Sequence, residues 1–371
     1  MSRLPFIASM GLSAAAMGVY LFFFLKRIAV CCHLNMPKRW LNLFIAFLAS
    51  AVVLLSLNLF GISALVILHI TVLGLLLDLL NLIVRMICKT VKLEPAKRWK
   101  TIYRCGLIPL LGTGIILTAG YFNMENIRRT DYSLTTDKLN TDYKIAFLSD
   151  LHYGTTMEKG KLQQICKEIS EAEPDLVLLG GDLIDENTSK EQMQTAFQTL
   201  GQIQSRYGCF YVYGNHDRQP YKENKDFYPD ELKAAIEGAG ITILCDETRT
   251  LNSELILIGR EDYGMGDARV KLQALLSDSD SRQFRLVLDH QPADIEEAHI
   301  NSCDLQLSGH THNGQIWPVG IFSALSNDLL YGIKKVENFS VIVSSGIGGW
   351  GYPIRTEGHS EWVMVELLAA E

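Results

Sequence analysis

The chain has 371 residues, 48% of them hydrophobic, and a formal net charge of −7. Residues 1–122 hold 12 Lys and Arg against 2 Asp and Glu, whereas residues 123–371 hold 22 against 39. This length allows two domains, and the uneven charge indicates two environments; the acidic second part excludes a long nucleic acid as a partner, because binding one requires a basic surface.

Four apolar segments lie in the basic first part. They cover residues 4–25, 41–59, 61–84 and 105–122, and Asp78 is the only acidic residue within them. About 20 consecutive apolar residues span a bilayer as a helix, whereas a soluble helical bundle requires charged residues on its outer faces. We therefore predict a transmembrane region of four helices over residues 1–122, with the lipid bilayer as its partner.

The loops around these helices predict an orientation in the cell membrane. The loops at Lys26–Arg39 and Arg85–Lys100 are basic and belong on the cytoplasmic side. Four spans then place the rest of this multi-pass protein outside the cytoplasm. Asp78 within a span is a candidate for an ion path, but we expect it to pair with a neighbouring helix or with Arg85.

Residues 123–142 are polar and are predicted to be a linker. From Tyr143 onwards, strands alternate with helices. The expected strands are 144–149, 176–179, 209–213, 241–244, 255–259, 284–288, 305–307, 339–343 and 361–367. The expected helices are 157–172, 190–200, 228–237 and 268–276. Early strand–helix alternation followed by strand-rich sequence predicts an α/β fold over residues 143–371, with a two-sheet β-sandwich flanked by helices.

Five polar motifs follow predicted strands in this region. They are Asp150-Leu151-His152, Gly181-Asp182-Leu183-Ile184-Asp185, Gly214-Asn215-His216-Asp217, His290 and Gly309-His310-Thr311-His312. Active sites of open α/β sheets gather at the carboxyl ends of strands. If the chain stays extended, Asp150 and His152 point to the same side, and the carboxylate of Asp182 can bridge two ions. The mixture of imidazole, carboxylate and amide ligands predicts two divalent metal ions, either Mn, Zn or Fe.

The order of these motifs resembles the calcineurin-like metallophosphoesterases, and the attached helices resemble the branch of transmembrane proteins with a metallophosphoesterase domain. The resemblance implies two ligand sets that share Asp182. The first set is Asp150, His152, Asp182 and His312, and the second is Asp182, Asn215, His290 and His310. It also implies that His216 protonates the leaving oxygen or holds the phosphoryl group, that Asp217 orients its ring, and that Asp185 fixes a ligand by a hydrogen bond.

The resulting functional expectation is a metal-dependent phosphoric ester hydrolase in which a hydroxide held between the two ions attacks phosphorus. We expect phosphodiester or pyrophosphate substrates, and the neighbouring membrane helices suggest lipid-linked or envelope molecules. Arg355, after a glycine-rich segment, is a candidate to bind the phosphate. The alternatives are a phosphomonoesterase or protein phosphatase with the same metals, a non-catalytic metal-dependent membrane scaffold, and a transporter.

Overall fold

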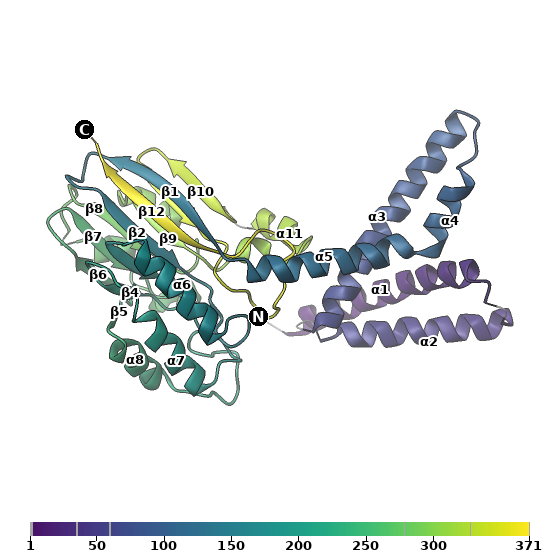
Figure 1. Cartoon of the computed structure of the whole chain (residues 1–371), viewed down its shortest axis with the longest axis horizontal. Helices are drawn as coiled ribbons and strands as arrows, with labels where there is room; N and C mark the ends of the chain where they lie inside the picture. Colours follow the sequence, from purple (N-terminus) through teal and green to yellow (C-terminus); the bar gives the residue numbers. More distant parts are fainter. Residues whose placement is uncertain (1–2, 35, 59–60, 278, 327, 371) are drawn as a thin grey trace. The chain divides into compact units, whose positions relative to one another are not determined.

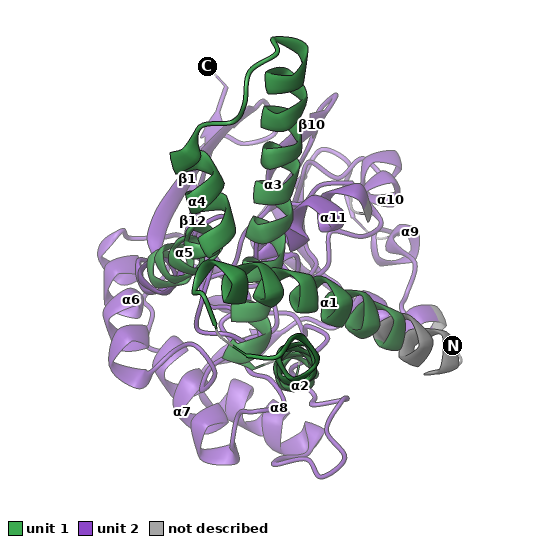
Figure 2. Ribbon diagram, turned by 90° about the vertical axis from the view of Figure 1, so that its right-hand side faces the viewer, with its two compact units in different colours: residues 1–119 green, residues 120–371 purple. Residues whose placement is uncertain are grey.

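The computed structural model describes residues 3–34, 36–58, 61–277, 279–326 and 328–370 (Figure 1). The chain divides into two compact units, Met1–Ala119 and Gly120–Glu371, which Figure 2 shows in different colours. The division falls within the helix Leu107–Glu125, whose last residues, from Gly120 onwards, belong to the second unit.

The first unit is helical. Its elements are α1 (Arg3–Cys31), α2 (Lys38–Ser56), α3 (Ile62–Thr90), α4 (Lys97–Cys105) and most of α5 (Leu107–Glu125). Four helices are long and apolar enough to cross a membrane: residues 11–31 of α1, together with α2, α3 and α5. The four predicted apolar helices are therefore confirmed. Helix α4 is an additional short helix within the second basic loop.

Polar and small side chains both contribute to packing in this unit. Asp78 of α3 forms an ion pair with Arg27 of α1 and accepts a hydrogen bond from Tyr20 at 3.1 Å. Asp78 thus pairs with a neighbouring helix and not with Arg85, and helix packing explains its presence in the span.

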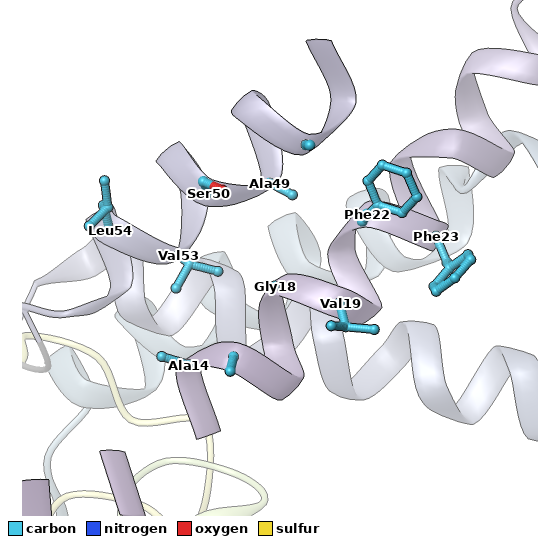
Figure 3. Close-up of a pocket in the computed structure, with 11 residues that line it drawn as sticks. Ala14, Gly18, Val19, Phe22, Phe23, Ala49, Ser50, Val53 and Leu54 are labelled. Atoms are coloured by element: carbon cyan, nitrogen blue, oxygen red, sulfur yellow. The ribbon is translucent and has the colours of Figure 1, made fainter. Parts of the chain in front are cut away.

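A groove of about 630 Å³ between α1 and α2 is lined largely by small and branched apolar residues, including Gly18 and Val53 (Figure 3).

The second unit contains two six-stranded sheets. In spatial order the first sheet consists of β1 (Arg128–Thr136), β12 (Glu361–Ala369), β2 (Tyr143–Leu148), β3 (Leu176–Leu179), β4 (Cys209–Tyr211) and β5 (Ile241–Ile243). The second consists of β10 (Gly332–Val336), β11 (Phe339–Val343), β9 (Leu305–Ser308), β8 (Phe284–Leu288), β7 (Leu255–Gly259) and β6 (Glu247–Thr250). Strands β2 to β5 are parallel to one another, as are β7, β8, β9 and β11.

The sheets pack face to face and helices cover their outer faces. The inner core includes Phe147 and Leu178 from the first sheet and Leu257 and Leu286 from the second, all fully buried. The first sheet is covered by α6 (Lys159–Glu171), α7 (Lys190–Leu200) and α8 (Pro229–Gly238). The second is covered by α9 (Leu272–Leu275) and α10 (Ile295–Ile300), and the remaining short helices are η1 (Tyr263–Ala268), η2 (His312–Gly314) and α11 (Val319–Ser326). The predicted two-sheet sandwich flanked by helices is confirmed.

Strand β1 lies where the sequence predicts a linker. It pairs in parallel with β12 along its full length, and Leu134 is buried in the inner core. Its sequence is mostly polar because β1 is an edge strand, with five of its nine residues exposed to solvent. An edge strand with one buried position lacks the apolar run by which the other strands are recognised.

Candidate metal centre

The candidate ligands lie where strands end. Asp150, Asp182 and Asn215 come after β2, β3 and β4, which are neighbouring parallel strands of the first sheet. His290 and His310 follow β8 and β9, which are neighbouring parallel strands of the second sheet. Parallel strands end on the same side of their sheet, so each sheet gathers its polar side chains at one edge.

Five of the candidate ligands have a left-handed backbone, which residues other than glycine seldom adopt. The φ angle is 57° at Asp150, 44° at His152, 50° at Asp182, 70° at His310 and 50° at His312. Asp150 and His152 therefore do not converge by alternation along an extended chain, as the sequence predicts, but because the backbone turns at both residues. Each such residue costs about 1–3 kcal/mol and persists only where its surroundings hold it.

Two glycines allow backbone segments to pass close to the ligands. Gly181 has a φ of 83°, and a Cβ at this position would lie 2.6 Å from the backbone nitrogen of Gly214 and 2.9 Å from Nδ1 of His290. A Cβ at Gly309 would lie 2.2 Å from Oδ2 of Asp150. Any other residue at either position would push the ligands apart.

The first group of ligand atoms comes from Asp150, His152 and His312, and these atoms lie within 4.8 Å of one another. The Nε2 atoms of His152 and His312 are 3.3 Å apart, and Nε2 of His312 is 3.5 Å from Oδ1 of Asp150. Asp150 and His152 are fully buried. The backbone N–H of His310 donates to the Asp150 carboxylate at 3.0 Å, which links this group to the second one.

The second group comes from Asp182, His290 and His310, again within 4.8 Å of one another. Nε2 of His290 lies 3.1 Å from Oδ2 of Asp182 and 3.1 Å from Oδ1 of Asn215. The other ring nitrogen of His290, Nδ1, lies 2.8 Å from the carbonyl oxygen of Gly180. A carbonyl only accepts hydrogen bonds, so Nδ1 carries a proton, and Nε2 is the nitrogen that can offer a lone pair to a metal once it is deprotonated.

The chemistry of these atoms fits divalent cations. Around the second group, Nε2 of His290 lies beside a carboxylate oxygen of Asp182 and the amide oxygen of Asn215, and all three atoms are of types that can offer lone pairs to a metal. Burial, together with the charge of His290, lowers the pKa of His310 to about 4, so its imidazole is neutral, the form that binds metal. Burial opposes ionisation of Asp182, but His290 outweighs this effect and lowers the pKa of the carboxyl. Burial opposes protonation of His290, but the carboxylates of Asp182 and Asp150 together have the larger effect and raise the pKa of the ring. A proton and a cation therefore compete for this ring.

Asp185 contacts His152, a candidate ligand of the first group. Its Oδ2 lies 3.3 Å from Nδ1 of His152 and accepts a hydrogen bond from Thr155 at 2.9 Å. Its backbone N–H donates to the hydroxyl of Thr188 at 2.9 Å. This is the position that its predicted role in fixing a ligand requires.

Asp217 has a role that the sequence does not predict. Its buried carboxylate accepts backbone N–H groups of Asp182 at 2.8 Å, Leu183 at 2.9 Å and Gly214 at 2.6 Å. Asp217 thus ties together the two turns that carry Asp182 and Asn215. The prediction that it orients the ring of His216 is wrong, because its oxygens are occupied by the backbone.

His216 is oriented by Glu186, a residue that sequence reasoning missed. Nδ1 of His216 lies 2.8 Å from Oε2 of Glu186. Burial lowers the pKa of His216, but the hydrogen bond to Glu186 and the charges of Asp182, Glu186 and Asp185 together outweigh burial, and the pKa lies above its ordinary value. The ring centroid is 5.6 Å from that of His152, and the rings of Tyr221 and Trp350 flank it at 5.3 and 5.7 Å. His216 therefore adjoins the ligands without belonging to either group.

Arg355 is turned into the protein. Its side chain is fully buried, and its guanidinium donates to the carbonyl oxygens of His312, at 2.7 Å, and of Gly348. Burial lowers its pKa to about 10, which leaves it charged at neutral pH. The prediction that Arg355 binds the phosphate is wrong, because the guanidinium instead holds the turn that carries a candidate ligand.

A comparison with protein families finds one match over this region. The family described as calcineurin-like phosphoesterase matches residues 143–314, which include all seven candidate ligands and His216.

Individual relatives are similar over longer stretches than the family match. An uncharacterized metallophosphoesterase of Helicobacter pylori is 35% identical over 71% of this chain and 72% of its own length. A transmembrane protein with metallophosphoesterase domain from Danio rerio is 28% identical over 72% of this chain, but the match covers only 64% of that protein. The phosphodiesterase YaeI of Escherichia coli is 30% identical over 61% of this chain and 82% of its own length.

Proposed function

The chain belongs to the calcineurin-like metallophosphoesterases, and from this premise we propose that it is a membrane-anchored dimetal enzyme that hydrolyses phosphodiester or pyrophosphate bonds of lipid-linked or envelope molecules. The enzyme class follows from the family, which consists of metal-dependent phosphoester hydrolases. The four apolar helices and the relatives named as transmembrane proteins establish association with a membrane. We retain a division near residue 122 between a membrane region and a phosphoesterase domain.

The observation that carries the proposal is the convergence of lone pairs at the ends of strands from both sheets. In the proposed arrangement, one metal ion is held by Asp150, His152, Asp182 and His312. The second is held by Asp182, Asn215, His290 and His310. Bound divalent cations, either Mn, Zn or Fe, would neutralise charge on the phosphoryl oxygens and increase the acidity of the attacking water.

In this proposal His216 donates a proton to the leaving oxygen. The hydrogen bond from Nδ1 to Glu186 leaves Nε2 for the substrate, and the raised pKa favours the protonated ring. Asp185 and Arg355 act indirectly, since they hold His152 and the backbone of His312. A non-catalytic scaffold is less well supported, because the chain retains both the ligands and the acid.

The choice of bond is tested with two soluble substrates. Full-length protein in detergent should hydrolyse bis-p-nitrophenyl phosphate with a kcat/KM at least about tenfold above that for p-nitrophenyl phosphate, since the proposed substrates are diesters and one relative is named a phosphodiesterase. Treatment with a chelator should abolish both activities, and separate addition of Mn, Zn or Fe identifies the metal that restores them. A preference for the monoester would instead support the phosphomonoesterase alternative.

We further propose that the phosphoesterase domain lies outside the cytoplasm. The basic loops between α1 and α2 and between α3 and α5 support this orientation, and α4 adds basic residues to the second loop. Alkaline phosphatase fused after Glu371 should be active in intact cells, since it folds only outside the cytoplasm. An inactive fusion of normal abundance would reverse the orientation.

A further inference from the structure

Helix α11 forms an apolar patch on the surface of the second unit. The exposed fractions are 44% for Val319, 53% for Ile321, 68% for Phe322 and 83% for Leu325, and we call these residues the α11 patch. The helix contains no charged residue. Leu325 is three residues after Phe322 and four after Ile321, so these three side chains share one face.

This patch differs from the other exposed apolar residues of the unit. Ile300, for example, is 69% exposed, but it ends α10, a helix that also carries Glu296 and Glu297. Single exposed apolar residues are ordinary, whereas contiguous ones mark a surface that binds a partner or a membrane. The exposure of Ile321 and Leu325 on one face of α11 therefore makes this helix a candidate surface for a partner or a membrane.

The helix is fixed to the metal-site turn. It begins seven residues after His312, and a Cβ added to Gly314 would lie 2.2 Å from Cα of Gly320. The backbone of η2 thus touches the first turn of α11. Consequently, α11 is anchored to the turn that carries the candidate ligand His312.

The same region is bound to the last turn of α5, within the second unit. The backbone N–H of Arg355 donates to the carbonyl oxygen of Gly120 at 3.0 Å, and the Asn123 amide donates to the carbonyl oxygens of Arg355 and Gly358 at 3.1 and 2.7 Å. One residue after Arg355, the hydroxyl of Thr356 accepts the backbone N–H of Trp317, two residues before α11 begins. Residues 355–358 therefore connect the end of a membrane-spanning helix to the start of α11.

The end of α5 has the composition of a membrane boundary. Tyr121 and Phe122 are 48% and 65% exposed, and such aromatic residues concentrate where a span leaves the hydrocarbon. Glu125, which ends the helix, forms an ion pair with Lys161 at 2.7 Å and marks the aqueous side. Residues 355–358 bind this end of α5 and Trp317, so the start of α11 is held to the same loop as the end of the span.

We propose that the α11 patch inserts into the boundary between lipid head groups and acyl chains, and that the metal centre beside it acts on phosphoesters of amphiphilic molecules that remain in the membrane. Interfacial helices of this kind bury their apolar face about 5–10 Å into that boundary. The substrate class rests on the proposed phosphoesterase function, whereas the insertion of α11 does not. Lipid, and not a second copy of the chain or a protein partner, is the occupant, because the end of a span is bound to the same loop.

Insertion is tested by fluorescence of the full-length protein in nanodiscs of dioleoylphosphatidylcholine. The tryptophan emission of Leu325→Trp minus that of the parent protein reports on the substituted position. This difference should fall by about half or more when the lipid carries bromine on its upper acyl carbons. The matched control is Ile300→Trp, which replaces a similarly exposed residue and should show no quenching. Unquenched fluorescence of Leu325→Trp overturns the proposal, and cross-linking of copies through α11 would do the same.

The substrate class is tested with two diesters that share a leaving group. These are bis-p-nitrophenyl phosphate in solution and dioleoylglycerol phospho-p-nitrophenol in the nanodisc. Leu325→Asp should lower kcat/KM for the lipid diester about tenfold and leave the rate with the soluble diester unchanged, because it disturbs only the approach from the membrane. Ile300→Asp should leave both rates unchanged.

The outcomes separate the two proposals. If the metal-loaded parent protein cleaves neither diester, the proposed function fails, while the quenching experiment still tests insertion. If the parent cleaves both and Leu325→Asp cleaves both at the parent rates, the inferred substrate class is overturned and the proposed function stands.

Discussion

At His216 neighbouring carboxylates, Glu186 first among them, favour the protonated ring. The side chain is largely buried and adjoins two proposed cation sites, and both conditions favour a neutral imidazole. The hydrogen bond to Glu186 opposes them and raises the pKa of the ring. The proposed acid therefore depends on a residue that binds neither metal nor substrate.

We expect Glu186→Gln to retain the contact with His216 but to lose the charge that favours the imidazolium. For a diester with an alkoxide leaving group, kcat should fall about tenfold, because that group requires a proton. With p-nitrophenolate, which leaves without one, kcat should change little. The exposed Glu191→Gln is the matched control, and bound metal measured by atomic emission should be unchanged. Equal losses with both leaving groups would contradict the proposed acid role.

The sequence motifs predict the candidate metal ligands, but they do not predict the residues that hold these ligands and His216 in position. Asp217 immediately follows His216 in the chain, yet its carboxylate binds the backbone of the Asp182 turn. Glu186 immediately follows Asp185, and this position next to a motif was the only available signal for it. Such roles depend on contacts between turns from different strands, which spacing along one segment does not contain.

Among the secondary-structure elements, those with continuous apolar runs were predictable, and three polar edge strands were not. The predicted and observed limits coincide for β3, β7, β8 and β11, whose residues are all buried. Strands β1, β6 and β10 lie at sheet edges and are mostly polar or half-exposed, so their sequences resemble loops. Helix α11 was missed because it is short and lacks a polar face.

If β1 is an integral strand, its one buried side chain should matter for stability. Leu134→Ala removes a residue that is 7% exposed from the core between the sheets. We expect a loss of about 2–3 kcal/mol, or a decrease of roughly 5–10 °C in the unfolding temperature of the second unit. The exposed neighbour Thr135→Ala should have almost no effect. Thermal unfolding in detergent measures both, and equal, negligible changes would mean that residues 128–136 act as a linker.

For the whole molecule, the uneven charge corresponds to two compact units with different surroundings. In the first unit polar groups such as Asp78 pair between helices, whereas the second unit is built around a core between sheets. The sequence could not show that the second unit begins at Gly120. Residues 120–122 are part of an apolar span by composition, and the hydrogen-bond partners of Gly120 and Asn123 lie more than 230 positions later in the chain.

Because the proposed metal ligands all belong to the second unit, removal of metal should destabilise that unit alone. A ligand present at 100 times its Kd stabilises the folded state by about 2.7 kcal/mol. Calorimetry of the full-length protein in detergent should therefore show one transition that moves to lower temperature with a chelator and one that does not. In Asp182→Ala, which lacks the carboxylate shared by both proposed metal sites, the chelator should shift neither transition. Parallel movement of both transitions in the parent would exclude the assignment of the metals to one unit.

The hydrogen bonds between the last turn of α5 and Arg355 limit how the enzyme can be shortened. A soluble fragment that starts at Tyr143, where the family match begins, lacks Gly120, Asn123 and all of β1. It would expose the backbone edge of β12 to aggregation and release the main chain of the arginine that holds His312. Truncations intended for crystallisation should therefore begin before Gly120 and keep the final turn of the helix, even though this turn is apolar.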